Sequence, residues 1–287
     1  MSVIESTTAA SQQPWTRGRP SLSSVSVAER LGVGLFAVLI LVAITAPLIA
    51  SNPTVSVGQP FASPSMHHLL GTDDIGEDLF SRVVFGLRTS LVAAVVVIAF
   101  GVAIGGLVGL VAGTLGGWVD ALLMRVTDVF LTLPGPILAI AIVAAMGPSL
   151  KHTVIAVAIV WWPWYARLVR NEVRALIVRP HIDAARLART KTPRLMARHV
   201  LPGTLPPVVV AASLDVQILV LTLAGLSFLG LGSPPPAPEL GAMAARSSDY
   251  LVGHPLVPLA PGFALFLVAF AANLAGDGVR DLMHRRR

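Results

Sequence analysis

One acidic side chain, Asp215, lies deep inside a long apolar stretch, residues 204–238. Such a carboxylate is a candidate functional group, because an ionised side chain persists in hydrocarbon only with a partner or with water. It could relay protons, line a transport path and attract a cation or an amino group, or pair with a charge at a subunit interface. The sequence offers no second titrating group at comparable depth, so the relay ranks last and the other two roles stay open.

Motifs for covalent catalysis or metal binding are absent from the sequence. It has no cysteine, which excludes disulfides, zinc–thiolate sites and thiol catalysis. It also lacks the P-loop pattern, a His-Glu-x-x-His metal helix and a Gly-x-Ser-x-Gly nucleophile turn, and the pair His67-His68 is isolated. We therefore expect no catalytic site, no bound metal, no cofactor and no enzymatic activity of the chain's own.

An acidic cluster follows this histidine pair. Its carboxylates do not alternate as the ligands of an EF-hand calcium loop do. We expect instead a solvated segment that starts a helix on the outer face of the molecule. The cluster consists of Asp73, Asp74, Glu77 and Asp78.

The densest basic segment covers residues 167–205 and contains nine lysines or arginines. Within it, Pro180 suits the first position of a helix, and Asp183 would then lie in the first turn, where the helix dipole favours an acid. We expect a second short helix with Thr192 as its N-cap, ended by Pro202. Small side chains would give the first helix a narrow face, namely Ala184, Ala185 and Ala188.

A helix–turn–helix with these features could bind either of two surfaces. Its arginines would suit anionic lipid, on which an amphipathic helix lies flat. Its alanine face would suit a groove on another protein, because nothing bulky holds the two backbones apart. The alanines favour the protein partner.

The elements that must position these residues are membrane helices. Hydrophobic residues make up 54% of the chain and charged residues only 13%, with a mean hydropathy of +0.76, so the apolar surface must face lipid. We predict an all-α, polytopic membrane protein with six transmembrane helices, the fourth extended by the aromatic run 161–165 at the membrane interface. The apolar stretches are residues 31–50, 89–119, 129–150, 152–166, 204–238 and 251–276.

The distribution of basic residues sets the expected orientation. With the N-terminus inside, 17 of the 21 lysines and arginines fall on the cytoplasmic side. The positive-inside rule then favours an N-in/C-in topology, with residues 51–88 and 233–250 as outer loops. The same rule explains the net charge of +6 without nucleic acid as a partner.

Glycines recur every fourth residue along the second apolar stretch. This spacing places them on one stripe of a helix, where a neighbouring helix can approach closely. We expect a tight helix–helix seam rather than a sliding surface. The stripe consists of Gly101, Gly105, Gly109, Gly113 and Gly117.

Several motifs resemble a known family. Asp183-Ala184-Ala185, followed by Arg198-His199-Val200-Leu201-Pro202, is similar to the EAA loop of permease subunits in bacterial ABC importers. Five further stretches resemble the second ("C") permease of the dipeptide, oligopeptide and nickel importers, and the likeness covers roughly residues 30–287. These stretches are residues 71–82, 85–90, 165–170, 226–232 and 276–281.

The resemblance implies a type I ABC importer permease fold in the cytoplasmic (inner) membrane of a bacterium. It implies a coupling loop near residues 172–205 that docks on cytosolic ATPases. Two residues depart from the family pattern: Asp183 replaces a Glu, and Arg189 replaces a Gly at the turn, where a left-handed backbone would cost about 1–2 kcal/mol. The implied coupling residues are Asp183, Ala184, Ala185, Ala188, Arg189, Thr192, Arg198, His199 and Pro202.

We therefore expect a permease subunit that forms half of the translocation path of an ATP-driven peptide importer. The implied partners are a second homologous permease in a heterodimer, two ATP-binding subunits that hold the ATP and magnesium, an extracytoplasmic binding protein, membrane lipid and a peptide-like substrate. Nickel chelate or haem would also suit this branch, and a stand-alone secondary transporter is the runner-up. We expect a cytosolic tail at 1–29, a first helix and outer loop at 30–88, and the permease domain at 89–287.

Overall fold

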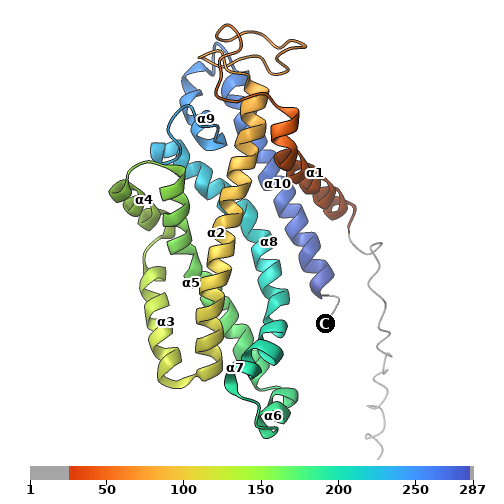
Figure 1. Cartoon of the computed structure of the whole chain (residues 1–287), viewed down its shortest axis with the longest axis vertical. Helices are drawn as coiled ribbons and strands as arrows, with labels where there is room; N and C mark the ends of the chain where they lie inside the picture. Colours follow the sequence, from red (N-terminus) through yellow and green to blue (C-terminus); the bar gives the residue numbers. More distant parts are fainter. Residues whose placement is uncertain (1–25, 285–287) are drawn as a thin grey trace, which may run out of the picture.

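The computed structural model describes residues 26–284, and most of this part of the chain is helical. Long helices run side by side, with short helices at both ends of the bundle (Figure 1). The α-helices are α1 (Val27–Ile49), α2 (Leu79–Leu115), α3 (Gly117–Thr132), α4 (Gly135–Met146), α5 (Leu150–Ile177), α6 (Pro180–Leu187), α7 (Thr192–Leu195), α8 (Leu201–Leu226), α9 (Leu240–Arg246) and α10 (Leu256–His284).

Helix α1 starts earlier than the predicted boundary at residue 30. Ser26 caps it, and the side chain of Glu29 bonds back to the backbone of Ser26, which forms a capping box. The last residues of the predicted tail 1–29 are therefore helical, while residues 1–25 lie outside the described part of the chain.

Most of each apolar stretch of the sequence lies in helix, but residues 232–238 and 251–255 do not. Within residues 26–284, four helices are long and apolar enough to cross a membrane, or up to five if the bent pair α3–α4 counts as one span. Helix α5 coincides with the fourth predicted span but carries Arg167, Arg170 and Arg174 in its second half. The protein is a multi-pass membrane protein, and the count of six spans stays a prediction.

The third span is broken, whereas the sequence predicted one helix over 129–150. Helices α3 and α4 meet at an angle of 83° around Leu133 and Pro134. Proline has no N–H to continue the helix, and it pushes the residue before it out of the α region. The charged segment 120–128, which was expected in a loop, consequently lies inside α3.

The glycine stripe of α2 forms a seam with α5. Gly101, Gly105, Gly109 and Gly113 are buried, and a Cβ on any of them would contact α5 within 3.0 Å. The prediction was wrong for Gly117, because α2 ends at Leu115 and Gly117 begins α3 with open space around it. The absence of side chains at these four glycines thus allows the backbones of α2 and α5 to come into contact along one face of α2.

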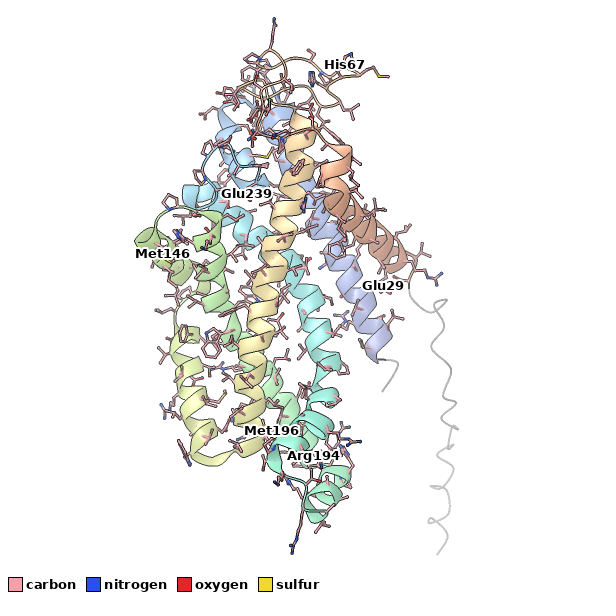
Figure 2. The ribbon with its side chains drawn as sticks, in the orientation of Figure 1. Glu29, His67, Met146, Arg194, Met196 and Glu239 are labelled. Carbon is pink, nitrogen blue, oxygen red and sulfur yellow. The ribbon has the colours of Figure 1, made fainter. Side chains whose placement is uncertain are left out.

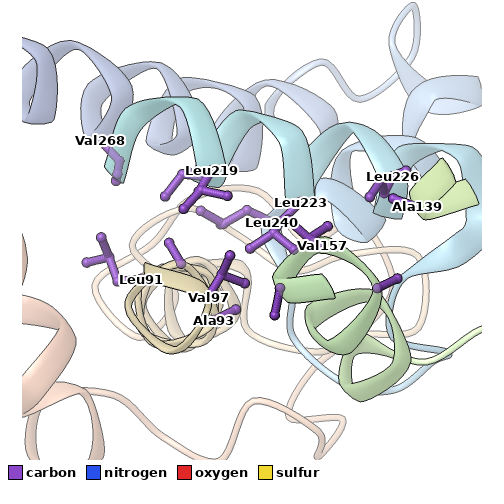
Figure 3. Close-up of a cluster of buried hydrophobic side chains, with 14 of the residues drawn as sticks. Leu91, Ala93, Val97, Ala139, Val157, Leu219, Leu223, Leu226, Leu240 and Val268 are labelled. Atoms are coloured by element: carbon purple, nitrogen blue, oxygen red, sulfur yellow. The ribbon is translucent and has the colours of Figure 1, made fainter. Parts of the chain in front are cut away.

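Apolar side chains fill the space between α2, α5 and α8 (Figure 3). Leu91 and Val97 of α2 pack there with Val157 of α5 and with Leu219 and Leu223 of α8. This core holds the long helices together at mid-height. The short elements at either end are therefore positioned by a rigid bundle.

The two predicted outer loops form a folded cap at one end of the bundle. The predicted loop 51–88 ends at residue 78, because α2 begins at Leu79, and the predicted loop 233–250 contains α9. His67 and Glu239 lie at this end, whereas Arg194 and Met196 lie at the opposite end (Figure 2).

Three acids of the cluster in the cap, Asp73, Glu77 and Asp78, are buried rather than solvated as the sequence suggested, while Asp74 is exposed. Asp73 and Glu77 contact the buried guanidinium of Arg82, and Asp78 caps α2. Burial raises the pKa of Asp73, and the charge of Arg82 opposes that rise. His68 is not isolated either, since its Nδ1 lies 3.1 Å from Oδ1 of Asp78. The carboxylates thus fix the cap to the start of α2.

The topology can be tested with single cysteines, because the natural chain has none. Met66 in the cap and Leu187 in α6 are 95% and 85% exposed. We expect an impermeant thiol reagent to label Met66→Cys on intact cells and Leu187→Cys only in inverted vesicles. The reverse pattern would contradict the predicted orientation.

Candidate functional site

The segment between α5 and α8 projects from the end of the bundle opposite the cap (Figure 1). Helix α6 begins at Pro180, with Asp183 in its first turn and an ion pair of 3.5 Å from Arg186 to Asp183. The non-helical part of the predicted loop 172–205 is short, because α5 extends to Ile177, α6 covers Pro180–Leu187 and helix resumes at Thr192. We call residues 180–200 the end element.

The alanines of α6 do not share one face. Ala185 is buried beside Ile182 in a cluster with Leu195 and Val200, so it faces this chain itself. Ala184 and Ala188 are exposed. The outward surface of the end element therefore includes these two alanines but not Ala185, because the burial of Ile182 decides which face turns inward.

One exposed residue of this surface was not expected from the sequence. Leu187 is 85% exposed at the end of α6, so its apolar side chain belongs to the outward surface of the end element. The sequence places Leu187 beside the alanines of this helix. The 3.6-residue period of a helix does not show, however, whether a side chain points into the protein or out of it.

The second half of the end element differs from the predicted helix. Lys191 is the residue before α7, so Thr192 is its first residue rather than its N-cap. Pro202 does not end the helix, which continues through a π turn at Met196–Val200 into α8. Pro202 is tolerated because it lies in the first turn of α8, directly after the π turn. Arg198 is exposed in this turn and His199 is partly buried.

The turn between α6 and α7 has the left-handed backbone that the sequence suggested. Arg189 has a φ of 55°, and non-glycine residues pay about 1–2 kcal/mol for that conformation. We expect Arg189→Gly to raise the free energy of unfolding by about 1 kcal/mol. Thermal unfolding of the detergent-purified chain measures it, and an unchanged or lower melting temperature would show that the arginine side chain compensates for the strain.

Three arginines of α5 form ion pairs with α3 rather than standing free in a loop. Arg170 binds Asp120 through Nε and Nη2 at 2.5 and 2.6 Å, and Arg174 reaches the same carboxylate at 2.5 Å. Arg167 lies 2.5 Å from Asp128. These residues tie the first half of the broken span to the helix that leads into the end element. Sequence reasoning missed the pairing because the partners are 39 to 54 residues apart.

Asp215 is positioned by α5 as well. It is 6% exposed, and its Oδ2 accepts hydrogen bonds from Nε1 of Trp161 at 3.0 Å and from the hydroxyl of Tyr165 at 2.7 Å. The expected aromatic belt is therefore only partly a surface feature, since Tyr165 is fully buried and Trp164 is 52% exposed. The carboxylate also lines a cavity, described below.

The structure leaves the expected site residues in two groups. The expected coupling residues gather at one end of the bundle, while Asp215 lies about half-way along α8 and is hydrogen-bonded to Trp161 and Tyr165. Three carboxyl and imidazole groups close enough to hold a metal ion are not found within residues 26–284.

The comparisons with known proteins point in one direction. The family model described as "Binding-protein-dependent transport system inner membrane component" matches residues 105–287. The chain is 39% identical over 272 residues to the dipeptide transport system permease protein DppC of Alkalihalophilus pseudofirmus, which covers 94% of this chain and 89% of that protein.

Two further relatives carry related names. The glutathione transport system permease protein GsiD of Pectobacterium atrosepticum is 43% identical, over 77% of this chain and 73% of its own. The probable D,D-dipeptide transport system permease protein DdpC of Escherichia coli is 39% identical, over 87% and 84%.

A solved structure shares the fold. A chain of the MetNI methionine ABC transporter in an inward-facing conformation superposes with a TM-score of 0.57 at 22% identity. The match covers 71% of this chain and 97% of that chain.

Proposed function

This chain belongs to the family of binding-protein-dependent transport system inner membrane components, and from that premise we propose that it is a permease subunit of a bacterial ATP-driven peptide importer. The names of its relatives support peptide cargo, with nickel chelate or haem as the alternative cargo within the same branch. In this role it lies in the inner membrane, forms half of the translocation path and does no catalysis itself.

The end element is the proposed dock for the cytosolic ATPases. The observation that carries this assignment is its position: an exposed, small-residue helix with an exposed leucine projects from the end of the bundle opposite the folded cap. Leu187 can enter a pocket on an ATPase, while Ala184 and Ala188 allow the two surfaces to approach closely. Exposed Arg186, Arg194 and Arg198 add charge around this contact.

Movement of the end element would be transmitted to the membrane part by continuous helix. It runs through the π turn into α8, which carries Asp215, and Ala185 locks α6 to the side chains at the base of α5 and α8. Closure of the ATPases would thus tilt α8 and α5 together as one rigid unit. Alternating access follows if a second permease subunit rocks in the opposite sense.

The cap of residues 51–78 and α9 is the proposed landing surface for an extracytoplasmic binding protein. Its buried carboxylates and Arg82 give it a fixed shape, which a docking partner needs. Phe61 packs edge-on against Tyr250 with ring centroids 4.9 Å apart, so the two predicted outer loops form one surface.

Co-purification tests the proposal. When the tagged chain is extracted from membranes in mild detergent, we expect it to bring down a second permease subunit and two ATP-binding subunits. Recovery of the chain alone, with transport activity intact, would contradict the proposal and favour a stand-alone secondary transporter.

A further inference from the structure

A cavity of about 420 Å³ opens between α5, α8 and α10 on the side of Asp215. Its size falls in the ~300–1,000 Å³ range of small-ligand sites. Most of its lining is apolar, including Val210, Leu214 and Ile218 of α8. Asp215 contributes a nearly buried carboxylate to this wall, and Trp164 contributes an indole ring.

The carboxylate of Asp215 is held by neutral donors only. Trp161 and Tyr165 both donate to Oδ2, which leaves Oδ1 to accept from a group in the cavity. Within residues 26–284, no basic side chain forms an ion pair with Asp215. Hydrogen bonds from neutral donors stabilise a carboxylate without neutralising its charge.

The remaining lining also favours a cation. None of the residues that line the cavity is lysine, arginine or histidine. The ring of Trp164 offers a face on which a cationic group is attracted. The cavity therefore suits a ligand with one cationic group and an apolar remainder.

We propose that this cavity is a transit site for the α-ammonium group of peptide cargo, with Oδ1 of Asp215 as the acceptor. The proposal rests on the proposed function, because a peptide must reach the interior of the bundle for the site to be used. The apolar wall around Ile218 would receive the side chains of the cargo. A peptide whose amino group is acetylated lacks the charge and leaves the carboxylate unpaired.

The test uses single cysteines in a chain that has none. Ile218 and Val209 lie on α8 and are each 43% exposed, but only Ile218 lines the cavity. The importer complex, without its extracytoplasmic binding protein, is reconstituted in nanodiscs with Ile218→Cys or Val209→Cys. The rate of alkylation is then measured with alanyl-phenylalanine or with its N-acetyl derivative.

At a peptide concentration about tenfold above its Kd, we expect the free dipeptide to slow alkylation of Ile218→Cys by about tenfold, because the reaction is limited to the unoccupied site. The acetylated peptide should have no effect, and Val209→Cys should respond to neither. Adding Asp215→Asn should abolish the protection, while Asp215→Glu should restore part of it, which a merely structural role would not explain.

Four results would overturn the site. Three of them are equal protection by the acetylated peptide, full protection in the Asp215→Asn variant, and an Ile218→Cys that is unreactive in the ligand-free complex because a partner subunit fills the cavity. An Ile218→Cys that reacts but is protected by neither peptide would also overturn it. ATP-dependent uptake by the wild-type complex tests the proposed function separately, so uptake without protection refutes the ammonium site alone.

Discussion

Gly109→Leu should prevent the chain from folding into a stable bundle. A Cβ at this position would overlap the carbonyl oxygen of Ala166 and lie 2.9 Å from the amide nitrogen of Arg170. These are backbone atoms of α5, so they cannot move aside as a flexible side chain does. We expect a loss of about 3 kcal/mol or more, since overpacking of a close contact costs that much when relief requires a backbone shift.

Gly106 supplies the matched control on the same helix. A Cβ there has no neighbour within 4 Å, so Gly106→Leu adds the same side chain without a clash. It should instead stabilise α2 by about 0.8 kcal/mol, the difference in helix propensity. The measurement is the melting temperature and the monodisperse yield of each variant after detergent extraction. Equal behaviour of the two variants would contradict the seam.

The second large effect concerns the end element. Ala184→Trp should weaken ATPase docking about thirtyfold, the loss expected when about 2 kcal/mol is removed from the centre of an interface. Ala184 is exposed on α6, so the ring leaves the fold of this chain intact. Ala185→Trp is no test of docking, because Ala185 packs inside this chain and the variant would disrupt its own core.

Val38→Trp provides the control for this experiment. Val38 is 54% exposed on α1, within a predicted membrane span, where an added indole is tolerated. Retention of the ATPase subunits and cargo-stimulated ATP hydrolysis should both fall in Ala184→Trp and stay unchanged in Val38→Trp. Full stimulation with Trp at 184 would refute the docking role and favour lipid as the surface that binds α6.

The helices were predictable because their signal is local. A run of apolar residues long enough to cross a membrane indicates a helix whatever surrounds it, and most of each of the six stretches is helical. Glycines at a spacing of four likewise report a seam, although the sequence could not show that α2 stops before Gly117. The family motifs indicated a function, whereas composition alone indicated only a membrane protein.

The contacts between distant segments were not predictable in the same way. The orientation of α6 depends on Ile182 finding a pocket beside Leu195, so the inward place of Ala185 is a tertiary property. Asp120 pairs with arginines 50 and 54 residues away, and Asp215 is bonded by two aromatic residues of another helix. No periodicity in one segment encodes such partners, which is why these charges were assigned to loops or left open.

Uptake of a labelled dipeptide tests the central claim most directly. The complete complex, reconstituted in proteoliposomes with its binding protein on one side and ATP on the other, should accumulate the peptide only when ATP is hydrolysed. A proton or sodium gradient without ATP should drive no uptake. Accumulation by this chain alone, driven by an ion gradient and independent of ATP, would contradict the account.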